Sequence, residues 1–180
     1  TGRVIIGRSG GLTVSPDGEA APEAAEARTE KPQPLIDPAL WAKLADQPAR
    51  DGARALMRDV IDASRGRKSQ ARLALARFYA AQNLMAEAKG PLAALMADDV
   101  AMRENREALF LKGLVAAGMH RDKDALAAFN APQIREDVEA GLWRALVQQR
   151  LGQNTQALAS FRRGEQILDP GWVAAATSAQ

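Results

Sequence analysis

An internal repeat constrains this 180-residue chain more than any other feature. Residues 71–88, 108–125 and 140–157 align on a final alanine, and the steps between those alanines are 37 and 32 residues. Each stretch has a small residue twelve positions before the alanine, and a bulky apolar residue follows it by four positions. Units of this length bury their apolar faces by stacking on one another, so the repeat predicts a helical array. The residues expected to pack the repeats together are Ala76, Ala88, Gly113, Ala125, Phe129, Ala145, Ala157 and Phe161.

The composition favours an all-α fold. Alanine occupies 38 positions, which suits closely packed helices better than a β-sandwich. The same alanines, with 18 arginines against 6 lysines, are typical of a GC-rich bacterial genome. The basic cluster Arg65, Arg67 and Lys68 lacks interleaved aromatic residues, so we expect no nucleic-acid partner. No apolar run approaches the roughly 20 residues that span a bilayer, so we expect no transmembrane segment.

The chain divides at its proline-rich beginning. Residues 1–14 contain two short β-like runs around a glycine-rich turn, and we expect either the tail of an upstream domain or a docking strand. Residues 15–36 have almost no large apolar side chain, which predicts a flexible linker. Asp37 and Pro38 then form a helix start, and residues 37–68 are expected to form a degenerate first hairpin that closes at Gly66. Residues 69–180 should hold three hairpins and a C-terminal tail.

The third copy of the repeat is the most regular. It contains Trp143, Ala145, Gly152, Ala157 and Phe161 and closes with an Asp-Pro pair at 169–170. This pattern resembles the tetratricopeptide repeat, and the resemblance covers residues 69–170. It implies a right-handed superhelical array of antiparallel helix hairpins, a TPR-like α-solenoid. The copies depart from the pattern at Gly90-Pro91, where the second helix should kink or start late, and at Pro132, which should leave a short helix.

The resemblance also implies a binding surface. In that family the first helices of the hairpins line a concave groove that binds protein or peptide. Carried over to this chain, the groove holds an apolar stripe rimmed by arginines, which suits an apolar helix or extended segment with acidic flanks. The residues assigned to it are Leu73, Arg77, Phe110, Leu114, Leu142, Leu146, Gln149 and Arg150. We therefore expect an interaction module or scaffold within a larger bacterial assembly.

An alternative is a structural spacer whose groove is closed. The apolar segments Val4–Ile6 and Leu35–Ile36 border a linker that has no core of its own, so either one could lie in the groove. Further repeats could cover it as well. In both cases the array would be self-occluded rather than open to a partner.

The sequence offers little catalytic chemistry. The absence of cysteine excludes a catalytic thiol or thiolate metal site, and the single histidine, His120, excludes a multi-histidine site. Gly7, Ser9 and Gly11 match a nucleophile-elbow pattern, but the helix that this chemistry requires does not follow them. We therefore predict no enzymatic activity, no cofactor and no metal. A β-like segment, a proline-rich linker and a helical array are typical of modular envelope proteins, which favours the periplasm over the cytoplasm.

Overall fold

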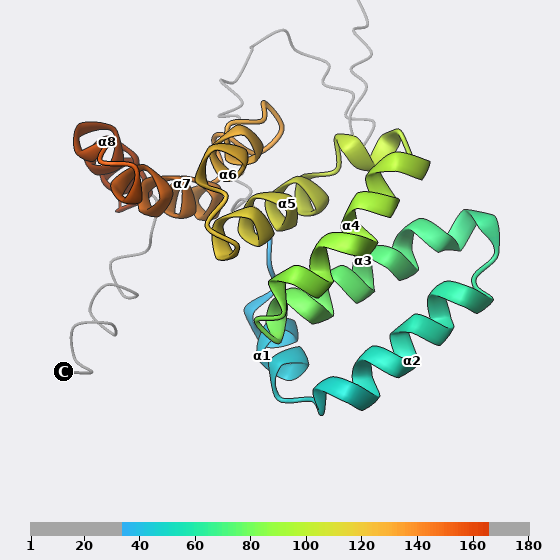
Figure 1. Ribbon diagram of the computed structural model, residues 1–180. Coiled ribbons are helices and arrows are strands. Elements are labelled where there is room, and N and C mark those ends of the chain that lie inside the picture. The colour runs from blue at the N-terminus through green and yellow to red at the C-terminus, as the bar shows by residue number, and fades with distance from the viewer. Residues whose placement is uncertain (1–33, 166–180) are drawn as a thin grey trace, which may run out of the picture. The chain divides into compact units, whose positions relative to one another are not determined.

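The computed structural model describes residues 34–165, and this part of the chain is all-helical (Figure 1). The expected all-α class is confirmed for these residues. The expected β-like segment, most of the linker and the C-terminal tail lie outside them. The helices are α1 (Pro38–Ala45), α2 (Ala49–Asp62), α3 (Arg65–Ala81), α4 (Met85–Asp98), α5 (Arg106–Gly118), α6 (Asp122–Phe129), α7 (Val138–Arg150) and α8 (Asn154–Glu165), with a short 3-10 helix, η1 (Ala101–Arg103), before α5.

The helices pack in pairs and in order along the chain. Helices α3 and α4, α5 and α6, and α7 and α8 form the three closest pairs, and each pair also contacts the next. Contacts from α1 to α3, from α3 to α5 and from α5 to α7 join these four helices into one row (Figure 1). Both α1 and α2 pack against α3, and they do not pack closely against each other.

The three hairpin turns repeat the same backbone geometry. Asn83, His120 and Gly152 each have a positive φ, of 58°, 56° and 74°, and each lies two positions after the last residue of the first helix of a pair. The next residue in each turn donates its backbone N–H to a carbonyl five positions earlier, as in a Schellman motif. These bonds join Leu84 to Tyr79, Arg121 to Ala116 and Gln153 to Gln148, at 2.8, 2.8 and 2.9 Å. The three turns are separated by the same 37 and 32 residues as the sequence repeat, so the repeat is a structural one.

Local signals set several helix boundaries. The Asp37 carboxylate accepts a bond of 2.9 Å from the backbone N–H of Ala39, which caps the start of α1 as expected. The expected closure at Gly66 is wrong, because extended backbone at Ala63 and Ser64 ends α2 and α3 has already begun at Arg65. The helix boundary therefore lies four residues before the expected division at 68–69.

Proline affects the α3–α4 and α5–α6 hairpins differently. Pro91 lies inside α4, which starts at Met85, so the late start considered for this helix is excluded. Gly90 has no Cβ, which relieves the clash that a helical residue before proline would otherwise meet. Helix α6 is short, as expected, and ends at Phe129, three residues before Pro132.

The core follows the helix pairs. Its largest fully buried side chains include Phe78, Phe110, Phe129, Leu95 and Leu111. The rings of Phe110 and Phe129 lie 5.8 Å apart with their planes inclined at 54°, which joins α5 to α6. Aromatic rings that pack at an inclined angle stabilise a fold by more than the burial of their apolar area alone would.

Candidate functional site

The expected apolar stripe is not an open surface. Leu73, Phe110 and Leu114 are only 3%, 1% and 3% exposed, so their assignment to an open groove must be corrected. These side chains face other helices and a neighbouring segment, and they belong to the core of the array. Of the remaining apolar residues in the stripe, Leu142 is half-buried and Leu146 is exposed.

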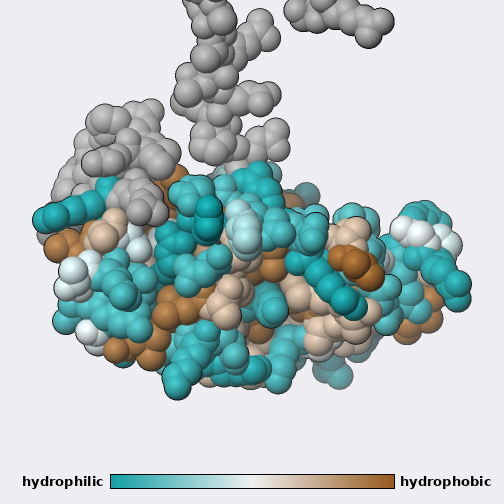
Figure 2. Space-filling view, turned by 90° about the horizontal axis from the view of Figure 1, so that it is seen from above, coloured by the Kyte–Doolittle hydropathy of each residue, from teal (hydrophilic) through white to brown (hydrophobic). Residues whose placement is uncertain are grey.

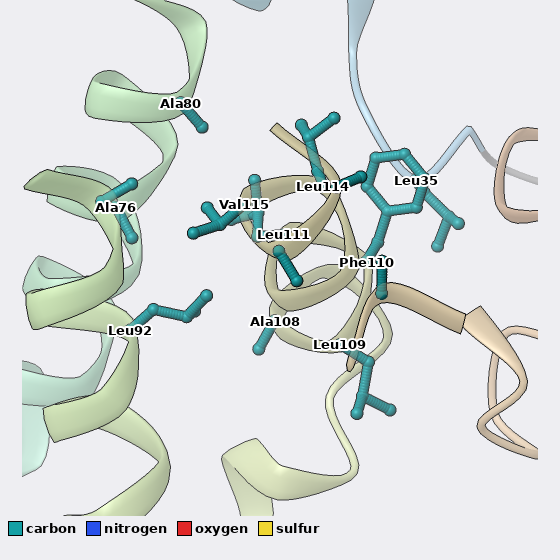
Figure 3. Close-up of a cluster of buried hydrophobic side chains, with 14 of the residues drawn as sticks. Leu35, Ala76, Ala80, Leu92, Ala108, Leu109, Phe110, Leu111, Leu114 and Val115 are labelled. Atoms are coloured by element: carbon teal, nitrogen blue, oxygen red, sulfur yellow. The ribbon is translucent and has the colours of Figure 1, made fainter. Parts of the chain in front are cut away.

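Residues just before α1 help to bury the side chains of Phe110 and Leu114. Leu35 is itself buried and belongs to the same core cluster as Phe110 and Leu114. Figure 3 shows Leu35 on the same side of α5 as those two residues. Its backbone N–H donates a bond of 2.7 Å to the Glu139 carboxylate, although the two residues are 104 positions apart. The segment that begins at Leu35 therefore lies across α5 and the start of α7.

The end of α1 is held by a second polar contact. The Gln82 side-chain amide, at the end of α3, donates to the carbonyl oxygens of Leu44 and Gln47 at 2.6 and 2.8 Å. Leu44 lies in the last turn of α1 and Gln47 just beyond it, a region where carbonyl groups lack the usual i+4 partner of a helix. The bonds of Leu35 before α1 and of Gln82 at its end thus hold α1 in place within the row of α1, α3, α5 and α7.

The arginines expected at the rim are used inside the chain. Arg77 forms a bidentate ion pair with Glu107, in which Nη2 of the arginine donates to Oε2 of the glutamate at 2.8 Å. Arg150 pairs with Asp122 and donates to the Ala117 carbonyl at 3.0 Å. Each pair joins two different helices. The two arginines therefore stabilise the packing of neighbouring helices and are already bound to carboxylates of the same chain. Gln149, the last residue assigned to the rim, is exposed.

An apolar pocket remains open beside Leu35. It has a volume of about 520 Å³ and lies between α1, the C-terminal end of α3, the start of α4, and the sides of α5 and α7 that line it. Two tryptophans, Trp41 and Trp143, line it together with Met85 and Leu114, and Glu139 is its single charged residue. A pocket of this size and lining takes a large apolar side chain or several smaller ones.

The Glu139 carboxyl is electrostatically unusual. Its burial raises its pKa above the usual value of 4.5, and the nearby Asp137 carboxylate acts in the same direction. Bonds from the backbone N–H groups of Leu35 and Ile36 and the charge of Arg106 oppose this increase but do not cancel it. Because the folded chain holds the proton more tightly than the unfolded chain, the contribution of Glu139 to stability is greatest below about pH 4.5. It is lost as the pH rises through the raised pKa.

Glu139→Gln should therefore change how stability depends on pH. We expect the difference in melting temperature, variant minus wild type, to become more positive as the pH is raised from about 4 to about 7. The reason is that the wild type must bury a charged carboxylate at the higher pH, whereas glutamine carries no charge. The effect should be small, since the carboxyl is only partly buried. Thermal unfolding at matched ionic strength measures it. A difference between the two proteins that stays constant with pH would contradict this assignment of the pKa.

The residues expected to pack the repeats have different environments. Ala76, Ala88, Ala125, Phe129 and Ala145 are fully buried, and Gly113 and Ala157 are also buried. Phe161 is 37% exposed. The ring of its counterpart Phe129 packs on Phe110, and α6 packs against α5 and α7, whereas α8 packs closely against α7 alone among the described helices.

Sequence analysis did not identify the pocket. Trp143 was noted as a mark of the repeat, and neither Trp41 nor Met85 was connected with binding. Two of the three tryptophans, at 41 and 143, lie on helices that the structure places in one row, and the repeat alone does not place Trp41 there. Figure 2 shows a face of the molecule on which apolar patches lie between hydrophilic side chains.

Comparison with known proteins finds no matching family model, no similar curated protein and no similar solved structure. Within residues 34–165, no helix has the length and apolar character needed to cross a membrane. The same residues contain no group of three or more side chains arranged to hold a metal ion.

Proposed function

We propose that this chain is a non-enzymatic, tetratricopeptide-like interaction module that binds an extended apolar segment of a protein partner. The observation that carries the proposal is the pocket between Trp41 and Trp143, which lies on the row of α1, α3, α5 and α7. Aromatic side chains at the centre of a contact surface supply much of the binding energy in protein complexes. The proposal includes a place in a larger bacterial assembly, as the repeat resemblance implies.

The chain's own Leu35 supports an extended mode of binding. Its side chain is buried against α5 while its backbone N–H donates to Glu139. A partner segment entering the neighbouring pocket would use the same two kinds of contact, an apolar side chain between helices and a main-chain bond to a carboxylate.

A second candidate function is a self-occluded spacer. Two observations favour it. Leu35 is buried against the apolar residues of α5, and Arg77 is bound to Glu107, so neither the apolar face nor the arginine is accessible to a partner. In this case the pocket would remain without a ligand and the row of helices would serve only to hold neighbouring parts of a larger protein.

Peptide selection distinguishes the two candidates. Short random peptides displayed on phage are selected on the whole chain, and binding is followed by tryptophan fluorescence in a Trp172→Phe background, which leaves Trp41 and Trp143 as reporters. We expect enrichment of peptides with large apolar side chains. Ala42→Arg, at an exposed position lining the pocket, should weaken their binding about tenfold or more.

Ala45→Arg is the matched control, because Ala45 is also exposed on α1 but does not line the pocket. It should leave peptide binding unchanged. If no peptide is enriched, or if both variants bind equally well, the pocket is not a binding site and the spacer is the better description.

A further inference from the structure

A second groove lies between α4 and α6, away from the pocket of the proposed function. Helices α4 and α6 do not pack closely against each other, and part of α5 forms the floor between them. The groove has a volume of about 260 Å³. It shares no lining residue with the pocket beside Leu35, so the two surfaces can be tested separately.

Two of the helices that line the groove, α4 and α5, carry the same residue pattern. On α4 the lining residues are a lysine, an apolar pair and a methionine at positions i, i+3, i+4 and i+7, and on α5 the same spacing recurs 23 residues later. Residues with these spacings lie on one face of a helix over two turns, a length of about 10 Å. The two sets are Lys89, Leu92, Ala93 and Met96, and Lys112, Val115, Ala116 and Met119.

The two lysines stand at opposite ends of the groove. A Cβ atom on Gly118, the last residue of α5, would lie 2.6 Å from Cγ of Met85, the first residue of α4. The helices therefore run in opposite directions. Lys89 lies toward the end of α5, where Met119 is, and Lys112 lies toward the end of α4, where Met96 is.

The floor and the ends differ in chemistry. Leu92, Val115 and Ala116 are buried, whereas the methionines are half-buried, and methionine side chains adapt readily to an incoming apolar surface. Lys89 and Lys112 are exposed, and neither forms an ion pair with a carboxylate within the described residues.

The remaining charges at the groove do not neutralise these lysines. The single acidic lining residue, Asp124, is paired with Arg121 at 2.6 Å. The groove therefore presents an apolar centre with an uncompensated cation at each end. Three arginines of the array, Arg72, Arg77 and Arg106, by contrast each pair with a carboxylate that lies 26 to 31 positions further along the chain.

We propose that this groove binds an amphipathic helix of a partner protein whose apolar face is flanked at each end by an acidic side chain. The charges of such a helix complement Lys89 and Lys112, and its apolar side chains cover the two methionines and the buried floor. A gap between two helices accepts a third through side chains spaced at i, i+3, i+4 and i+7. Acidic residues about seven positions apart on that helix span the two turns between the lysines.

The test uses three fluorescein-labelled helical peptides with the same leucine face. They carry glutamate, glutamine or lysine at the two flanking positions, and binding to the whole chain is measured by fluorescence anisotropy. We expect the glutamate peptide to bind best and the lysine peptide worst, with about a tenfold difference that shrinks at high salt. The double variant Lys89→Glu/Lys112→Glu should reverse this order.

Lys43→Glu/Arg58→Glu is the matched control, because it makes the same change in net charge at exposed positions on α1 and α2. It should preserve the wild-type order, and Ala42→Arg should have no effect on any of the three peptides. An absence of binding by all three peptides, or an order that the groove variant leaves unchanged, would overturn the proposal. Such a result would not affect the pocket beside Leu35.

Discussion

Gly113→Ala should destabilise the chain by about 1–3 kcal/mol, although alanine favours helix formation by about 1 kcal/mol over glycine. Gly113 lies in α5, and a Cβ atom there would approach the Phe129 ring to 2.4 Å at Cε1 and 2.7 Å at Cζ. Phe129 is fully buried and its ring packs on Phe110, so it has no free space into which to move. The overlap must then be relieved by separating α5 from α6.

Thermal and urea unfolding measure this effect, with Gly66→Ala as the control. Gly66 also lies in a helix, α3, but a Cβ atom there would meet nothing within 4 Å. We expect the control to be neutral or to gain up to about 1 kcal/mol. If Gly113→Ala is as stable as Gly66→Ala, the close contact between α5 and α6 is wrong.

A double variant tests the contact directly. Phe129→Leu removes part of the ring and should lower stability by leaving a cavity. Combined with Gly113→Ala, it should cost less than the two single losses together, because the smaller side chain makes room for the new methyl group. A favourable coupling of at least about 0.5 kcal/mol is expected for residues in contact. Strict additivity would mean that the two positions do not touch.

The sequence was most informative where structure depends on local spacing. The steps of 37 and 32 residues between the repeat alanines also separate the three turns, because a small residue, a left-handed turn residue and a following alanine all recur within one hairpin. Gly66 was misassigned because a glycine near cations suits either the end of one helix or the first turn of the next. The extended backbone at Ala63 and Ser64 decides between them, and the available signal was Ser64, a residue type favoured at the N-cap, which is where it lies before α3.

The surface was harder to predict than the helices. Leu73, Phe110 and Leu114 have the spacing of one apolar helix face, and such a face suits a partner or the chain's own core equally well. What decides the outcome is the position of Leu35, whose bond to Glu139 joins residues 104 positions apart. Arg77 and Arg150 were similarly ambiguous, since their carboxylate partners lie on other helices.

Leu35→Ser should lower stability by about 2 kcal/mol, because it removes a buried apolar side chain that lies with Phe110 and Leu114. For a chain of this size that corresponds to a fall in melting temperature of about 4–8 °C. Ala39→Ser is the control, since Ala39 is exposed two residues into α1, and it should change stability little. Equal stability of the two variants would show that Leu35 does not hold its segment against α5.

Leu35→Ser should also remove the pH effect of Glu139. The pKa of that carboxyl is raised by burial, and part of the cover is the segment that Leu35 anchors. Once the segment leaves, the carboxyl is solvated and its pKa returns toward the usual value. Glu139→Gln should then have the same effect on melting temperature at low and neutral pH in the Leu35→Ser background. If the pH-dependent difference persists in that background, another element buries Glu139, and the segment before α1 does not close the groove.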